Sequence, residues 1–352
     1  MKSETLAEYD YTLPQELIAS EPVEPRDASR LLIYDTRTGQ MSFDVFRSLG
    51  KYLPAETLLA LNDTKVVPAR LHGERSSDGK RIECLLLVNE ISEPQTTIRA
   101  LANAHLTQDE VVTVGSWRFV VVGQEKNVFT LRPEFPLAEL GFVLEEMGET
   151  PIPPYIAGTE LDEEKLRSRY QSVLAKTPAS AAAPTASLHV TERLLRDLEQ
   201  KGIDHTTITL HVGLGTFAPV TEKQLSLGRL HSEYYHITHE TRGALCAAQE
   251  NRRPICAVGT TVVRTLESVA DDVCGSDGDM DGSTDLFILP PYDFKMVDAL
   301  ITNFHVPRSS LMALVDAFLR DRAAPHTILD LYYRAIEQRM RFYSFGDAML
   351  II

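Results

Sequence analysis

The chain has 352 residues, of which 43% are hydrophobic and 24% charged, a balance that excludes a disordered or fibrous protein and allows one or two globular domains. Its formal net charge is -15 and its basic residues occur at most in pairs, which argues against a nucleic-acid partner. No stretch approaches the ~20 apolar residues that span a bilayer, and the N-terminus lacks the apolar core of a secretory signal, so we predict a cytoplasmic protein without a membrane partner.

The first 66 residues alternate short apolar strands with a helical pattern, as α/β proteins do. Strands are predicted at 30–35 and 57–61, with a helical stretch at 43–52 between them.

Residues 67–150 have a different character, because closely spaced strand-like runs follow one another with turn residues between them. This pattern predicts an inserted small β domain, a barrel or a sandwich, with strands at 81–88, 96–101, 110–114, 117–122 and 127–131. A helix at 137–147 ends at Gly148, and the proline-rich segment 151–155 returns the chain to the main α/β domain, which comprises residues 1–66 and 151–352.

The rest of the main domain continues the alternation of strands and helices. Residues 277–285 are acidic and glycine-rich, and we interpret them as a solvated loop, because their spacing does not fit a calcium site. The aromatic segment 341–350 is predicted to be a closing strand of the core, with Asp347 reaching the pocket as the alternative. The remaining predicted elements are strands at 206–212, 254–258 and 299–303 and helices at 191–201, from 260 onward and at 311–319.

The four cysteines are scattered and form no C-x-x-C pair. We therefore expect neither a disulfide framework nor a zinc site, and a reducing compartment.

Several segments carry candidate chemistry at strand ends or helix starts. The turn Thr260-Thr261 with Arg264 begins a helix and suits an anion, although a tight turn whose threonine only caps the helix explains it equally well. His211 leads into Gly213-x-Gly215, which lacks the third glycine of a dinucleotide fingerprint and leaves an oxidoreductase as a weaker rival.

Two further histidines stand in similar places. Thr185 and His189 precede a helix, and Asn303 and His305 follow a strand. A lone histidine is more often structural than catalytic, but ligands of open α/β sheets gather at the carboxyl ends of strands, so these segments together predict one pocket.

In order along the chain, these and other segments resemble the S-adenosylmethionine:tRNA ribosyltransferase-isomerase family of queuosine biosynthesis. The segments include LALNDTKVVPARLHG, AAAPTASLH, TLHVGLGTFAPV, AVGTTVVRTLES, ALITNFHVPRSSLMALVDAF and RFYSFGDAML. The resemblance implies an α/β main domain interrupted by a small β-barrel domain. It also implies transfer and isomerisation of the ribosyl group of S-adenosylmethionine onto an aminomethyl-deazaguanine base in the tRNA anticodon, which gives epoxyqueuosine and releases adenine and methionine. The partners are then tRNA and S-adenosylmethionine, the latter as a substrate, with no cofactor and no metal.

This chemistry requires a base with a pKa near neutrality, a group that assists the departing adenine, and a site for the amino-acid end of the substrate. The predicted catalytic residues are His189, His211, His305 and Asp347, and the sequence leaves open which histidine is the base and which the acid. The predicted substrate-binding residues are Thr185, Gly213, Gly215, Thr216, Glu233, Thr260, Thr261, Arg264 and Asn303, of which Glu233 is expected, like Asp347, to hold the aminomethyl group or the base edge. The predicted contacts to tRNA phosphate are Arg70, Lys80 and Arg81.

The chain also departs from the family pattern. Ser187 stands where the family has glycine, Ala179 replaces another glycine, and Pro291 occupies the glycine position before Tyr292. Two alternatives therefore remain: a divergent paralogue with a different acceptor, and a non-catalytic binding protein on the same fold.

Overall fold

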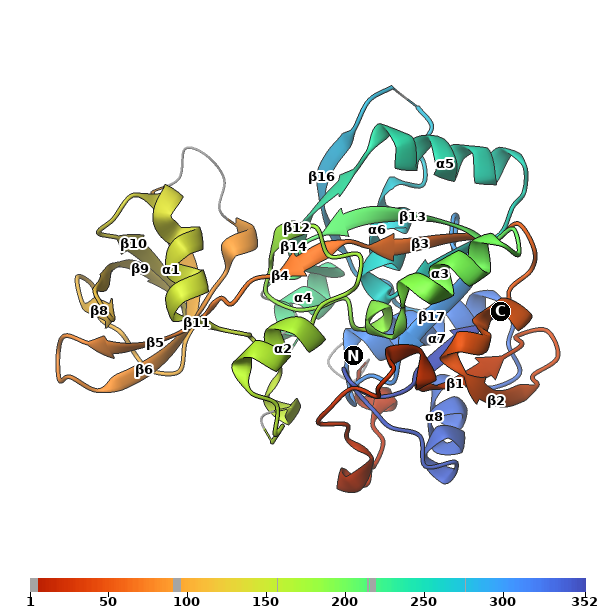
Figure 1. Cartoon of the computed structure of the whole chain (residues 1–352), viewed down its shortest axis with the longest axis horizontal. Coiled ribbons are helices and arrows are strands. Elements are labelled where there is room, and N and C mark those ends of the chain that lie inside the picture. The colour runs from red at the N-terminus through yellow and green to blue at the C-terminus, as the bar shows by residue number, and fades with distance from the viewer. Residues whose placement is uncertain (1–5, 91–95, 157, 214, 216–219, 276) are drawn as a thin grey trace.

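The structure, a computed structural model, describes residues 6–90, 96–156, 158–213, 215, 220–275 and 277–352. It has a main domain and a smaller domain that projects from one side of it (Figure 1).

The main domain is built on a mixed sheet with the spatial strand order β16-β14-β13-β3-β15-β17-β18-β1-β2. Strands β13, β3, β15 and β17 lie parallel to one another, whereas β18 runs antiparallel to β17. The carboxyl ends of the four parallel strands therefore meet at one edge of the sheet. The strand bounds are β1 (Arg30–Tyr34), β2 (Met41–Val45), β3 (Leu58–Asn62), β13 (Asp204–Leu210), β14 (Arg229–Ile237), β15 (Ile255–Val258), β16 (Met280–Leu286), β17 (Ala299–Asn303) and β18 (Ala348–Ile351).

Both faces of the central strands β3, β15 and β17 are buried, and these strands are apolar except for Asn62, Thr302 and Asn303 at their carboxyl ends. Along β3, Leu58 and Ala60 pack into one core, whereas Leu59 and Leu61 pack into the other. The first core is covered by α5 (His239–Glu250), α6 (Thr260–Val269), α7 (Ser310–Asp321) and α8 (Ile328–Glu337). The second is covered by α3 (Glu192–Glu199) with the 3-10 helices Phe46–Lys51 and Thr185–His189.

The smaller domain is a closed β-barrel. Its strands follow the order β5-β6-β7-β10-β9-β8, and β8 pairs again with β5. Gly73 permits this closure, because a Cβ there would lie 2.9 Å from the Thr113 carbonyl oxygen. The prediction of an α/β domain with an inserted barrel is thus confirmed. The bounds are β5 (Arg70–Arg75), β6 (Arg81–Leu86), β7 (Ile98–Ala102), β8 (Val111–Val114), β9 (Trp117–Glu125), β10 (Val128–Pro133), α1 (Leu140–Met147) and β11 (Gly148–Glu149), which pairs with β5.

A two-stranded parallel ribbon joins the two domains. It consists of β4 (Thr64–Val66) and β12 (Thr177–Ser180). The short helices α2 (Glu163–Arg169) and α4 (Glu222–Leu227) lie near this junction in Figure 1. In the described part of the chain, no helix combines the length and the apolar character that crossing a membrane requires.

Of three predicted elements, the first was confirmed in part, the second was wrong and the third was confirmed. Residues 43–52 contain the end of β2 and a 3-10 helix, because Phe43 pairs with Leu32 across the antiparallel β1–β2 ladder. The predicted loop at 277–285 contains most of β16, which pairs with β14 at the edge of the sheet. The aromatic C-terminal segment does end in a closing strand, β18.

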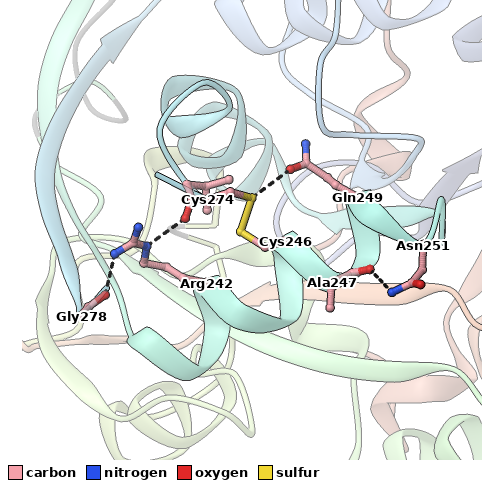
Figure 2. The surroundings of a disulfide bond; sticks show 8 residues. Arg242, Cys246, Ala247, Gln249, Asn251, Cys274 and Gly278 are labelled. Carbon is pink, nitrogen blue, oxygen red and sulfur yellow. Dashed lines mark hydrogen bonds between the residues drawn. A yellow bond between two sulfur atoms is a disulfide. The ribbon is translucent and has the colours of Figure 1, made fainter. Parts of the chain in front are cut away.

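The expectation that the cysteines form no disulfide was also wrong, because Cys246 and Cys274 are disulfide-bonded (Figure 2). Cys246 lies on α5 and Cys274 follows α6. From α5, Arg242 donates to the Val273 carbonyl at 3.0 Å and to the Gly278 carbonyl at 2.7 Å. The segment before β16 is therefore fastened to α5 by a covalent bond and by a guanidinium.

Candidate functional site

A cavity of about 680 Å³ lies where the parallel strands end. This volume suits a small organic ligand, and the position is the usual one for ligands of parallel sheets. The predicted site residues that line it are Thr185, Gly215, Glu233, Thr260, Thr261, Arg264, Asn303 and His305. Thr216 lies outside the described residues.

The turn between β15 and α6 forms one wall of this cavity. Gly259 has a φ of 98°, in the region that favours glycine, and it lets the chain turn sharply from strand to helix. The Thr261 hydroxyl accepts a hydrogen bond from Asn62 Nδ2 at 3.2 Å, and the same amide donates to the Leu210 carbonyl at 3.0 Å. Asn62 thus ties the start of α6 to the end of β13, and the first turn of α6 faces the cavity.

Arg264 and Glu233 form a buried ion pair at the cavity wall, with side chains only 8% and 6% exposed. Arg264 Nε also donates to the Leu286 carbonyl at 3.0 Å, and Glu233 accepts from the Gly213 N–H at 3.1 Å. The charge of Arg264 is therefore balanced before any ligand binds. Gly213 lies behind Glu233 and holds its carboxylate in place.

Asn303 connects the cavity to a buried histidine. Its Oδ1 accepts from the Thr185 hydroxyl at 2.9 Å, and its Nδ2 lies 3.2 Å from His189 Nε2. The opposite ring nitrogen, Nδ1, lies 2.9 Å from Ser29 Oγ. Burial lowers the pKa of His189 to about 3, with Arg341 and Arg26 adding to the effect, so its ring is neutral at physiological pH.

Of the three predicted histidines, His305 lines the cavity. Its Nε2 lies 2.9 Å from the Thr302 hydroxyl, and its backbone N–H donates to the Tyr332 hydroxyl at 2.7 Å. The Tyr11 hydroxyl donates to its carbonyl at 2.6 Å. Burial lowers the pKa of His305 to about 4, which leaves the ring uncharged and able to accept a proton.

His211 does not line the cavity, although it follows β13 directly as predicted. Its Nδ1 lies 2.7 Å from the Thr64 hydroxyl, and its ring stacks on Tyr234. Burial lowers its pKa to about 4, against the opposing effect of Asp63. The structure places it at the joint between β13 and the ribbon.

Asp347 likewise lies away from the cavity. It is buried, and its two carboxylate oxygens accept from the backbone N–H groups of Arg30 at 2.9 Å and Arg341 at 2.8 Å. This arrangement joins the start of β1 to the start of β18.

The predicted RNA contacts all lie on the barrel, and each has an acidic neighbour. The pairs are Arg70 with Glu83 at 3.3 Å, Lys80 with Asp78 at 3.3 Å and Arg81 with Glu74 at 3.9 Å. Lys80 and Arg81 have side chains 73% and 89% exposed, so they remain accessible to a large partner.

Sequence reasoning missed an aromatic part of the wall. Tyr155 and Tyr343 line the cavity with their ring centroids 4.7 Å apart, and the Tyr155 hydroxyl lies 2.7 Å from Ser344 Oγ. Both segments are conspicuous in the sequence, one by its prolines and the other by its aromatic residues, but nothing in it shows that they meet. His231, on β14, was missed as well.

Among the described residues, no group of three or more His, Cys, Asp or Glu side chains is placed to hold a metal ion.

The mixed sheet, the inserted barrel and the cavity at the strand ends define an α/β protein whose cavity lies at the position where enzymes of this class bind their substrates. The sequence model described as Queuosine biosynthesis protein matches residues 6–351, and the chain belongs to this family.

Two relatives agree with this assignment over nearly their whole length. The chain is 43% identical over 347 residues to S-adenosylmethionine:tRNA ribosyltransferase-isomerase of Caldanaerobacter subterraneus subsp. tengcongensis, which covers 98% of this chain and 99% of that protein. A crystal structure of S-adenosylmethionine tRNA ribosyltransferase from Thermotoga maritima superposes with a TM-score of 0.55 at 33% identity, over 98% of this chain and 100% of that one.

Proposed function

We propose that this protein transfers and isomerises the ribosyl group of S-adenosylmethionine onto the aminomethyl-deazaguanine base of a tRNA anticodon, forming epoxyqueuosine and releasing adenine and methionine. The observation that carries the proposal is the 43% identity to a ribosyltransferase-isomerase across 98% of the chain. The cavity supports it, because about 680 Å³ is sufficient for a nucleoside sulfonium. The reaction would take place in the cytoplasm, with S-adenosylmethionine as a substrate and without a metal or cofactor.

His305 is the best-placed proton acceptor for this reaction. It lines the cavity, it is neutral, and its contact to Thr302 fixes the ring. The sulfonium acidifies the adjacent carbon, but the His305 pKa of about 4 lies below the near-neutral value expected of the base, so proton removal would depend on direct contact between the ring and that carbon. The Glu233–Arg264 pair and the first turn of α6 are proposed to receive the charged amino-acid end of the substrate.

We propose that tRNA approaches along the barrel. Lys80 and Arg81 are accessible cations there, and phosphate would compete with Asp78 and Glu74 for them. Arg70 is more enclosed, and it donates to the Ile152 carbonyl at 2.7 Å. It would therefore fix the path of the linker that carries Tyr155.

The test is adenine release from S-adenosylmethionine in the presence of tRNA that carries the aminomethyl-deazaguanine base. We expect release that depends on this tRNA and that falls at least 100-fold in His305→Gln. His72→Gln is the matched control, since His72 is an exposed barrel residue paired with Glu149 and should leave release unchanged. Release that does not require tRNA would contradict the proposed acceptor, and normal release by His305→Gln would contradict the role of His305.

A further inference from the structure

A chain of hydrogen bonds runs from the cavity wall into the interior through four side chains. Thr185 contacts Asn303 at 2.9 Å, Asn303 contacts His189 at 3.2 Å, and His189 contacts Ser29 at 2.9 Å. Thr185 and Asn303 line the cavity, whereas His189 and Ser29 are buried behind them. His189 is therefore separated from any ligand by Asn303.

The direction of each hydrogen bond follows from the chemistry of the amide. An asparagine accepts only through oxygen and donates only through nitrogen. Since Oδ1 faces Thr185, the threonine hydroxyl must donate to it. Since Nδ2 faces His189 Nε2, that ring nitrogen must accept, and the ring proton then resides on Nδ1 and is donated to Ser29 Oγ.

This order fixes what the wall offers to a ligand. The only hydroxyl proton of Thr185 is committed to Asn303, so toward the cavity its oxygen presents lone pairs alone. A flipped amide would reverse each bond and turn Thr185 into a donor. Such a flip would also require the other tautomer of His189, with Nε2 donating to Asn303 and Nδ1 accepting from the Ser29 hydroxyl, so the amide orientation and the ring tautomer are coupled.

We propose that His189 is a positioning residue that acts through Asn303 and holds the Thr185 hydroxyl as a hydrogen-bond acceptor. The Thr185 oxygen then accepts a hydrogen bond from a ribose hydroxyl of S-adenosylmethionine. The inference rests on the proposed function, because that function supplies the ligand. A neutral donor fits this part of the wall, since its neighbours Ala182, Ala183, Pro184 and Ala186 carry no charge. The charged end of the ligand has the Glu233–Arg264 pair elsewhere in the cavity.

The test is calorimetric binding of S-adenosylmethionine without tRNA, so that turnover is not needed. Thr185→Val should bind about tenfold more weakly, as for one lost hydrogen bond. His189→Leu should do the same, and His189→Gln should bind within about threefold of the unmodified protein, because the glutamine oxygen can replace Nε2 as acceptor. In a protein that already carries Asn303→Ala, His189→Leu should not lower the affinity for S-adenosylmethionine any further.

Ribose analogues separate this role from a structural one. One of the two analogues, 2′-deoxy or 3′-deoxy S-adenosylmethionine, should bind the unmodified protein about tenfold more weakly than S-adenosylmethionine does. Thr185→Val should bind that analogue and S-adenosylmethionine with equal affinity. This arm does not require a folded His189 variant. The inference would be overturned if each analogue lost the same affinity, relative to S-adenosylmethionine, on the unmodified protein and on Thr185→Val. Additive effects of the Asn303 and His189 substitutions on affinity would also overturn it.

The outcome also separates the inference from the proposed function. If the binding pattern holds while tRNA triggers no adenine release, the inference stands and the proposed function fails. If the unmodified protein does not bind S-adenosylmethionine, both are overturned.

Discussion

Replacing Arg264 by methionine would leave the Glu233 carboxylate buried without its cation. Both side chains are more than nine-tenths buried, and Arg264 also donates to the Leu286 and Thr284 carbonyls, so those oxygens would lose a partner too. Removing one member of a buried pair costs about 3–5 kcal/mol. We expect a loss of that size in the free energy of unfolding for Arg264→Met.

The smaller change Glu233→Gln keeps an oxygen for the Gly213 N–H and should cost about 1.5–3 kcal/mol, the value of a hydrogen bond to a charged group. The double variant should lose at least about 1 kcal/mol less than the sum of the two single losses, because neither charge is then left alone. Arg229→Met is the matched control. It removes an exposed pair between Arg229 on β14, the strand that also carries Glu233, and Asp285 on β16, and should cost less than about 1 kcal/mol.

Urea unfolding can assign this loss to one domain, because the chain has a single tryptophan. Trp117 lies on β9, so its fluorescence reports on the barrel, whereas far-UV circular dichroism reports on both domains. Arg264→Met should shift the circular dichroism transition of the main domain and leave the fluorescence transition in place. A loss no larger than that of Arg229→Met, or strictly additive losses in the double variant, would refute the assignment of a coupled buried pair.

Three other expectations follow from buried groups. The pKa values of His211 and His305 lie near 4, below the ordinary 6.5, so on acidification the unfolded chain takes up protons before the folded one does. The free energy of unfolding should therefore fall between about pH 6.5 and 4, by up to about 1.4 kcal/mol per pH unit and group. His211→Gln should flatten this pH profile, measured by urea unfolding at each pH. Ser187 Oγ is buried without a hydrogen-bond partner, so Ser187→Ala should raise the free energy of unfolding by about 1 kcal/mol; a loss in thermal unfolding would show that the hydroxyl is satisfied. The Cys246–Cys274 bond closes a loop of 28 residues, so dithiothreitol should cost about 3–4 kcal/mol in urea unfolding, and a Cys246→Ser variant should be insensitive to the reductant.

Local sequence pattern was sufficient for the parts of the fold that local pattern determines. Apolar runs in the sequence predict the buried strands β3, β15 and β17, and closely spaced short strands without helices between them predict the inserted barrel. Strand β16 was missed because its residues, MDGSTDL, are polar and acquire strand structure only through pairing with β14. The disulfide was missed for a similar reason, since the packing of α5 against the end of α6 brings two unremarkable cysteines together.

The same distinction holds for the site. The sequence predicted that the strand-end segments share one pocket, and residues from these segments do line the cavity. It did not predict which side chain of each segment faces the cavity. His305 lines it, whereas His189 reaches it only through Asn303, and His211 points to Thr64. Consecutive residues at a strand end point in different directions, so a shift of one position separates a lining residue from a buried one.

The electrostatics of the cavity fit a cationic substrate better than the sequence suggested. Arg264 looked like a free cation in the sequence, yet Glu233 balances it, and burial keeps His305 neutral at physiological pH. A sulfonium entering this space would meet no net positive charge. The paired rings of Tyr155 and Tyr343 would attract it, because aromatic faces stabilise a cation most strongly where water is excluded. An acidic chain that balances the buried charge of its cavity and also exposes cations on its barrel is therefore consistent with two separate tasks, holding a charged small substrate and meeting RNA phosphate.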